Sequence, residues 1–294
     1  MGLPFVTRPP TDAEMKLLNL MISTFTDGSG NQREADGSSR AGWRELERVF
    51  AEFLTGAMHH EDKHVFDVIA PDWHEPKTHY GISVKSKQLT GRRTPFERHP
   101  DATAYLEIAN SPAKMWEGIT SRTGLVSGHF ERREEAQAIG DALLQTIAGW
   151  KTAAKGIYEA QNRGVELAIP NSIYLNVSWS PFNGDRRNLH LCSFPMTFPA
   201  VQWVYGSQRC LRGIDPRYPG VALFDWYALS GGQLKYYPRF TDSLFDAPIQ
   251  RLERLGSMSI YQKAVQYFEA DYADLAGELQ PEQLALLDRL IVEL

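Results

Sequence analysis

Cysteine, positive charge and long apolar runs are all scarce in this chain of 294 residues. Its two cysteines are too few for a disulfide framework or a zinc ribbon. No apolar run approaches the ~20 residues that a membrane-spanning helix needs. Acidic residues number 36 against 31 lysines and arginines, which argues against a protein that coats nucleic acid through a strongly basic surface. A local basic cleft on an acidic molecule is still compatible with this balance.

The N-terminal stretch MGLPFVTRPPTDAEMK lacks the basic-then-apolar pattern of a secretory signal. We therefore expect a cytoplasmic protein without a membrane partner. The composition, 43% hydrophobic and 23% charged, is typical of globular proteins. The length suits one large domain or two smaller ones, and no internal repeat or obvious linker divides the chain.

The N-terminal half alternates between predicted helices and a predicted strand pair. Helices are expected at 11–25, where Thr11 and Glu14 form a capping-box pattern, and at 43–57, where apolar residues recur at helical spacing. Strands are expected at 64–71 and 78–89, and the short link between them favours an antiparallel hairpin. A helix starting at Ser111 and a long helix over 132–163 follow.

The C-terminal half is richer in predicted strands. Alternating and β-branched segments bounded by Gly- and Pro-rich turns predict strands at 171–179, 188–196, 200–206 and 220–229. Two helices, about 259–275 and 281–293, close the chain. This order of elements predicts an α/β or α+β fold.

Charged side chains with chemical potential concentrate around the strand GISVKSK. Its alternation places Ser83, Lys85 and Lys87 on one face. Asp67 lies on the preceding strand, and Glu47 lies at the flank of the apolar stripe of the second helix. Carboxylates are ligands of hard divalent ions such as Mg²⁺, and a lysine can orient water or stabilise charge on a phosphate. The set predicts metal-assisted attack of water on a phosphodiester.

The segments AGWRELERVFAEFL, HVFDVIAPD and YGISVKSK, in this order, resemble the PD-(D/E)xK nuclease superfamily with its restriction-endonuclease fold, over about residues 40–120. The resemblance implies that Asp67 is a metal ligand, Lys85 the catalytic lysine and Glu47 an auxiliary glutamate. It also implies one nuclease domain, 1–294, with a mixed central sheet flanked by helices. Within it we expect a catalytic core at about 40–200, strand-rich DNA-recognition elements at about 170–240 and C-terminal helices at 257–294.

The chain departs from this pattern at Ser83, where the motif usually has an acid. Some restriction endonucleases of the superfamily share this Ser-x-Lys form and take the carboxylate from a glutamate on the following helix. The candidates here are Glu107 and Glu97, and we favour Glu107, as a second metal ligand, because its apolar neighbourhood is expected to be ordered. Asp72 competes with Asp67 for the metal-ligand position; Asp67 is preferred because it lies inside the strand.

The resemblance points to a Mg²⁺-dependent Type II restriction endonuclease that cuts double-stranded DNA. A symmetric target favours a homodimer or a higher even oligomer, and such a system includes a cognate DNA methyltransferase. Arginine reads guanine edges and clamps phosphates. Basic side chains of the loops and strands are therefore the candidate DNA contacts: Lys87, Arg92, Arg93, Arg186, Arg187, Arg209 and Arg212.

Two other function classes stay open on this sequence. One is a repair or structure-specific nuclease of the same fold. The other is a non-catalytic DNA- or protein-binding domain whose active site has decayed, which the missing acid at Ser83 would allow. A separate cluster, MHHEDKH (58–64), has histidines and carboxylates at short spacing that could bind zinc. Its position at a predicted helix end favours a solvated loop.

Overall fold

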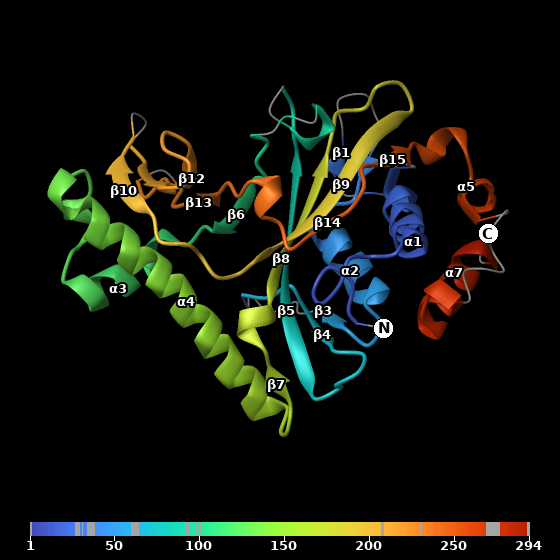
Figure 1. Cartoon of the computed structure of the whole chain (residues 1–294), viewed down its shortest axis with the longest axis horizontal. Helices are drawn as coiled ribbons and strands as arrows, with labels where there is room; N and C mark the ends of the chain where they lie inside the picture. The colour runs from blue at the N-terminus through green and yellow to red at the C-terminus, as the bar shows by residue number, and fades with distance from the viewer. Residues whose placement is uncertain are drawn as a thin grey trace.

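The computed structural model describes residues 2–26, 30, 32–33, 39–59, 65–91, 94–97, 99, 101–206, 209–229, 231–268 and 277–292. Helices combine with a mixed sheet and a second, antiparallel sheet (Figure 1). The chain is thus an α+β protein, as its order of elements predicts. Whether the mixed sheet is a restriction-endonuclease core stays a prediction.

The larger sheet carries the predicted strand pair at its centre. Its order is β14-β9-β8-β5-β4-β3, with β15 also pairing β9 and β7 pairing β5. The pairings of β5 with β8 and β7 are parallel and the others are antiparallel. The strands are β3 (Met58–His59), β4 (Val68–Pro71), β5 (Thr78–Gln88), β7 (Glu166–Leu167), β8 (Ile173–Trp179), β9 (Arg186–Pro195), β14 (Phe245–Asp246) and β15 (Gln250–Glu253). The predicted antiparallel β4–β5 hairpin is confirmed.

The second sheet is antiparallel throughout, in the order β10-β11-β12-β13-β6. Its strands are β6 (Leu106–Ala109), β10 (Gln202–Tyr205), β11 (Leu211–Ile214), β12 (Ala222–Trp226) and β13 (Leu234–Tyr236). Only β10 and β12 correspond to predicted strands. The other three, β6, β11 and β13, are three or four residues long. A separate two-stranded sheet pairs β1 (Gln32–Arg33) with β2 (Ser39–Arg40).

Helices cover both faces of the larger sheet (Figure 1). One core contains residues of α1 (Asp12–Ser23), α2 (Trp43–Phe53), α5 (Ile260–Phe268) and α7 (Pro281–Val292). The other contains residues of α3 (Pro112–Thr123), α4 (Ala136–Gln161) and the second sheet. The capping box predicted at Thr11 and Glu14 is present at the start of α1. None of the helices in the described part of the chain has the length and apolarity that crossing a bilayer requires.

The two faces of the central strand β5 differ in chemistry. Ile82 and Val84 belong to the core beneath α1 and α2. Ser83 and Lys85 lie on the opposite face, as the alternation of GISVKSK predicts. On that face the neighbouring strand β8 contributes Tyr174 to the second core. A polar strip is therefore held on a sheet whose other face is apolar and buried.

Two glycines of α4 lie in opposite environments. A Cβ on Gly140 would meet the Trp203 ring of β10 at 2.1 Å, whereas a Cβ on Gly156 would meet nothing within 4 Å. We expect Gly140→Ala to lower the free energy of unfolding by about 1–3 kcal/mol through overpacking. Gly156→Ala, at an exposed helix position, should raise it by about 0.5–1 kcal/mol. Chemical denaturation measures both, and equal effects of the two substitutions would contradict this packing of α4 on the second sheet.

Candidate active site

The point where β4 separates from β5 organises the candidate site. Pairing of the two strands ends with Val68 opposite Ile82, and one further bond runs from the Asp67 N–H to the Ile82 carbonyl at 2.9 Å. The next β5 donor on this side is the N–H of Val84, which donates to Asp67 Oδ2 at 2.8 Å. The aspartate side chain thus takes the place of the departing strand and satisfies a buried backbone donor.

Asp67 also collects two side chains of β5. Ser83 Oγ donates to Asp67 Oδ2 at 2.9 Å, and Lys85 Nζ lies 3.5 Å from the same oxygen. All three donors use Oδ2, so Oδ1 receives no hydrogen bond from the described residues. The Asp67 and Lys85 side chains are 20% and 22% exposed. This leaves one carboxylate oxygen and the ammonium group partly accessible to a ligand.

Glu47 joins this group from α2. Its carboxylate is buried and bonds His59 Nε2 at 3.0 Å. Burial raises the pKa of Glu47 above its ordinary value of 4.5, and the negative charge of Asp67 raises it further, while His59 and Lys85 act in the opposite direction. The charges of Asp67, beside β4, and of Lys85, on β5, therefore both influence the Glu47 carboxyl group of α2.

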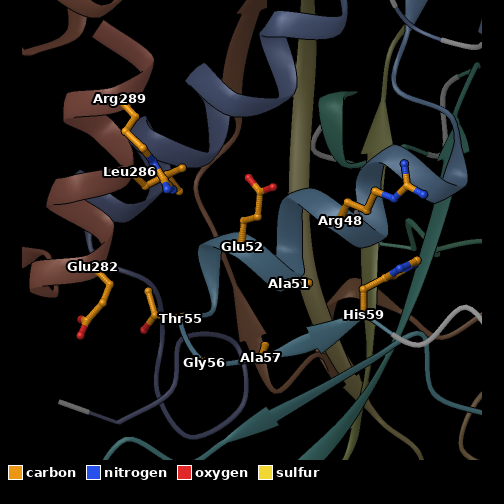
Figure 2. Close-up of a pocket in the computed structure, with 10 residues that line it drawn as sticks. All are labelled: Arg48, Ala51, Glu52, Thr55, Gly56, Ala57, His59, Glu282, Leu286 and Arg289. Atoms are coloured by element: carbon orange, nitrogen blue, oxygen red, sulfur yellow. The ribbon is translucent and has the colours of Figure 1, made fainter. Parts of the chain in front are cut away.

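His59 is a member of the group that sequence reasoning missed. The MHHEDKH segment favours a solvated loop, but His59 lies on β3, opposite Val68 of β4; His60, Asp62 and His64 lie outside the described residues. The signal that could have identified β3 is the hydrophobic strand β4 that follows it, because β4 needs a hydrogen-bonding partner and β3 is that partner. His59 also lines an open hollow of about 440 Å³ between α2 and α7 (Figure 2). It thus links that hollow to the buried Glu47 carboxylate.

Asp72, the rival of Asp67, is engaged in the β4–β5 turn. Its Oδ1 accepts the N–H groups of His74 and Glu75 at 2.7 and 3.0 Å, and its Oδ2 accepts the Tyr80 hydroxyl at 3.1 Å. Burial tends to raise the pKa of Asp72, but these hydrogen bonds outweigh burial and lower it. With both oxygens occupied, Asp72 caps the turn. The expectation that Asp67 lies inside the strand is wrong, because β4 begins at Val68 and Asp67 immediately precedes it. What distinguishes Asp67 from Asp72 is its Oδ1, which accepts no hydrogen bond from the described residues.

Within the described residues, no contact shows which carboxylate replaces the acid that the motif usually has at position 83. Glu107 lies on β6 of the second sheet rather than on a following helix, and its carboxylate makes no described hydrogen bond or ion pair. Tyr105, two residues earlier and on the same face of the chain, places its ring centroid 4.6 Å from Lys87 Nζ. Glu107 therefore lies on a strand whose face adjoins β5, while Glu97 is exposed on a short 3₁₀ turn.

The predicted DNA contacts have different environments. Arg92 and Arg93 lie outside the described residues. Arg187 is 3% exposed with its guanidinium 3.7 Å from the Phe182 ring centroid, so contact with DNA would require it to leave its buried position. Arg209 and Arg212 each bond a carboxylate, of Glu131 and Asp225 respectively, and Arg186 pairs with Glu253.

Two lysines lie near Tyr105 where the two sheets meet. The sequence reasoning identified Lys87 and missed Lys235. Lys87 of β5 lies on one side, and Lys235 Nζ of β13 lies 5.6 Å from the same ring centroid. Lys235 is paired across the sheet with Glu107. Two ammonium groups this close to one another are suited to contact phosphates.

We compared the chain with family models, curated proteins and solved structures, and none of these comparisons gives a match.

The raised pKa of Glu47 has a consequence for stability. A carboxyl group with a raised pKa in the folded state destabilises that state at pH above this pKa, and the penalty disappears as the pH falls toward the unfolded value. Glu47→Gln should therefore raise the free energy of unfolding at pH 7, and the gain should vanish below about pH 4.5. Urea denaturation across pH measures it. Glu52→Gln, an exposed change on the same helix, is the charge-matched control, and an equal gain there would contradict the prediction.

Proposed function

We propose that this chain is a Mg²⁺-dependent endonuclease of the PD-(D/E)xK kind that hydrolyses phosphodiester bonds of double-stranded DNA, acting as a Type II restriction enzyme. The observation that carries the proposal is the junction of Asp67, Lys85 and Glu47 where β4 leaves β5. Lys85 Nζ lies 3.5 Å from Asp67 Oδ2, and the charges of Asp67 and Lys85 both act on the Glu47 carboxyl group.

The donor set fits a hard divalent ion. Asp67 Oδ1 receives no hydrogen bond from the described residues, and the nearby Glu47 carboxylate is a second oxygen donor. A bound Mg²⁺ supplies Lewis acidity at the phosphate and a more acidic water. Asp67 and Glu47 would hold the ion. Their hydrogen bonds with Val84 and His59 orient the two carboxylates, and such preorganisation is what a catalytic site requires.

Lys85 has the second part in the mechanism. Its ammonium group lies 3.5 Å from Asp67 Oδ2, and its side chain is about one-fifth exposed. In the proposed mechanism it would orient the attacking water and neutralise charge that develops on the phosphate. Ser83 cannot supply a negative charge; its hydroxyl instead bonds Asp67. Glu107, on the strand that brings Tyr105 to Lys87, is proposed as the further carboxylate, with Glu97 as the alternative.

DNA is proposed to lie along the side that carries Lys85, at Asp67, and Lys87 and Lys235, near Tyr105. Cations on this face offset the overall charge of −5 locally. A two-fold target favours a homodimer or a higher even oligomer in the cytoplasm. A cognate DNA methyltransferase would accompany the enzyme.

The direct test is digestion of plasmid DNA by the purified chain with Mg²⁺. Discrete fragments are expected from the wild type, and Asp67→Ala and Lys85→Ala should each lower the cleavage rate by at least about 100-fold, as loss of a charge-stabilising or proton-transfer group does. Lys77→Ala, an exposed lysine just before β5, is the matched control and should cut normally.

The outcomes of this assay separate the alternatives. Smeared products or structure-dependent nicking would favour a repair nuclease, and absence of cleavage by a folded wild type would favour a non-catalytic binding domain. Normal cutting by both Asp67→Ala and Lys85→Ala would overturn the site. Glu107→Gln and Glu97→Gln, compared in the same assay, identify the missing carboxylate as the one whose change abolishes cleavage.

His59 should control the pH dependence of cleavage. The His59 hydrogen bond and charge both lower the pKa of Glu47, so His59→Ala should raise that pKa further. The acidic limb of the pH–rate profile should then move to higher pH, because Glu47 must be ionised to assist a cation. His59→Gln, which can restore a hydrogen bond, should move the limb partly back. Superimposable profiles for wild type and His59→Ala would rule out this role.

A further inference from the structure

A row of four polar or ionisable residues runs across the larger sheet on the face that carries Lys85. Register places Lys85 of β5 opposite Asn176 of β8, Asn176 opposite Cys192 of β9, and Cys192 opposite Asp246 of β14. Neighbouring strands are about 4.8 Å apart, so Cys192 is about 10 Å from Lys85. The far end of this row is therefore a separate place from the site around Asp67.

Three potential metal ligands meet at this far end. His190, two residues before Cys192 and on the same face of β9, directs its Nε2 to Asp246 Oδ1 at 2.5 Å. One ligand atom from each of His190, Cys192 and Asp246 lies within 4.8 Å of the others. Imidazole, thiolate and carboxylate together suit Zn²⁺ or a similar transition metal, whereas Mg²⁺ prefers oxygen ligands only.

We infer that His190, Cys192 and Asp246 form a binding site for a transition-metal ion of the Zn²⁺ class, distinct from the proposed Mg²⁺ site. The ion would take the place of the hydrogen between His190 Nε2 and Asp246 Oδ1, with the imidazole proton carried on Nδ1, and would be bound by the Cys192 thiolate, with release of the thiol proton to solvent. The inference does not depend on the proposed nuclease activity.

The buried polar groups around these ligands support this assignment. Asn176 is fully buried, and its amide nitrogen lies 3.6 Å from Cys192 Sγ, as an amide that stabilises a metal-bound thiolate does. The other amide atom, Asn176 Oδ1, has no hydrogen-bond partner among the described residues. A buried acceptor without a partner is unfavourable to the folded state.

The ligands can also close around an ion. A tetrahedral zinc site places its ligand atoms about 3.3–3.8 Å apart, so His190 Nε2 and Asp246 Oδ1, now 2.5 Å apart, must separate by about 0.8 Å, whereas any pair near the 4.8 Å limit must approach by about 1 Å. His190 and Cys192 are fixed in the sheet interior. Asp246, in contrast, is about half exposed on β14, a two-residue strand at the end of the sheet order. It can move inward, and its exposure gives the ion a path from solvent.

Cobalt is the probe for this site, because Co²⁺ reports a thiolate ligand by a charge-transfer band in the near ultraviolet. Chelator-treated full-length protein is titrated with Co²⁺, and one equivalent per chain with such a band, displaced by Zn²⁺, is expected. The proposed Mg²⁺ site contains no cysteine, so ions bound there give no such band. Failure here is thus distinguishable from failure of the nuclease proposal.

Variants assign the band to residues. Cys192→Ser should abolish it. Asp246→Asn changes an exposed side chain, so it should leave the circular dichroism spectrum unchanged and weaken Co²⁺ binding at least tenfold. Cys210→Ser is the matched control, since Cys210 is the other thiol of the chain and is also buried; it should leave the band unchanged. Absence of the band in the wild type, its survival in Cys192→Ser, or full affinity in Asp246→Asn would each overturn the inference.

Discussion

The hydrogen bond from the Val84 N–H to Asp67 Oδ2 is the contact on which the candidate site depends. Two antiparallel strands that separate leave backbone donors without partners, and a buried N–H must be satisfied. Asp67 satisfies it with its side chain. This fixes one carboxylate oxygen and leaves the other to face a ligand. The separation of β4 from β5 therefore creates the opening of the site and also holds its principal acid in place.

Everything else at the site is organised around that fixed carboxylate. The alternation of β5 puts Ser83 and Lys85 on the face that the carboxylate reaches. The pairing of β3 with β4 brings His59 to the edge of the same opening, where it holds Glu47 of α2. Burying Glu47 next to another acid is unfavourable to the folded state, as its raised pKa indicates. Such a local conflict is typical of functional sites.

The second sheet places further polar side chains next to β5. Strand β6 returns from the β5 side of the molecule and pairs with β13, which brings Tyr105, Lys87 and Lys235 together. The larger sheet also carries the row from Lys85 to Asp246 on this face. One sheet face thus presents two separated groups of ionisable side chains, one with oxygen ligands and one with nitrogen and sulfur ligands.

Local patterns in the sequence determined much of this protein. The capping box at Thr11, the periodicity of 43–57 and the alternation of GISVKSK predict α1, α2 and β5, because each pattern repeats within a few residues. The sequence motif likewise selects Asp67 and Lys85, and the fold brings them within 3.5 Å of each other. These features need only short-range geometry and the side-chain period of each element.

Only the tertiary structure decided which of these residues touch. It separated Asp67, which binds Val84, from Asp72, which caps a turn. It placed His59 on a strand and buried Arg187, and it moved Glu107 from an expected helix to β6. Strand partners and register are set by contacts between residues far apart in the chain, and short strands such as β3 and β6 have too few residues to show a period. The physical reason is that local propensity fixes the elements, whereas long-range packing fixes their neighbours.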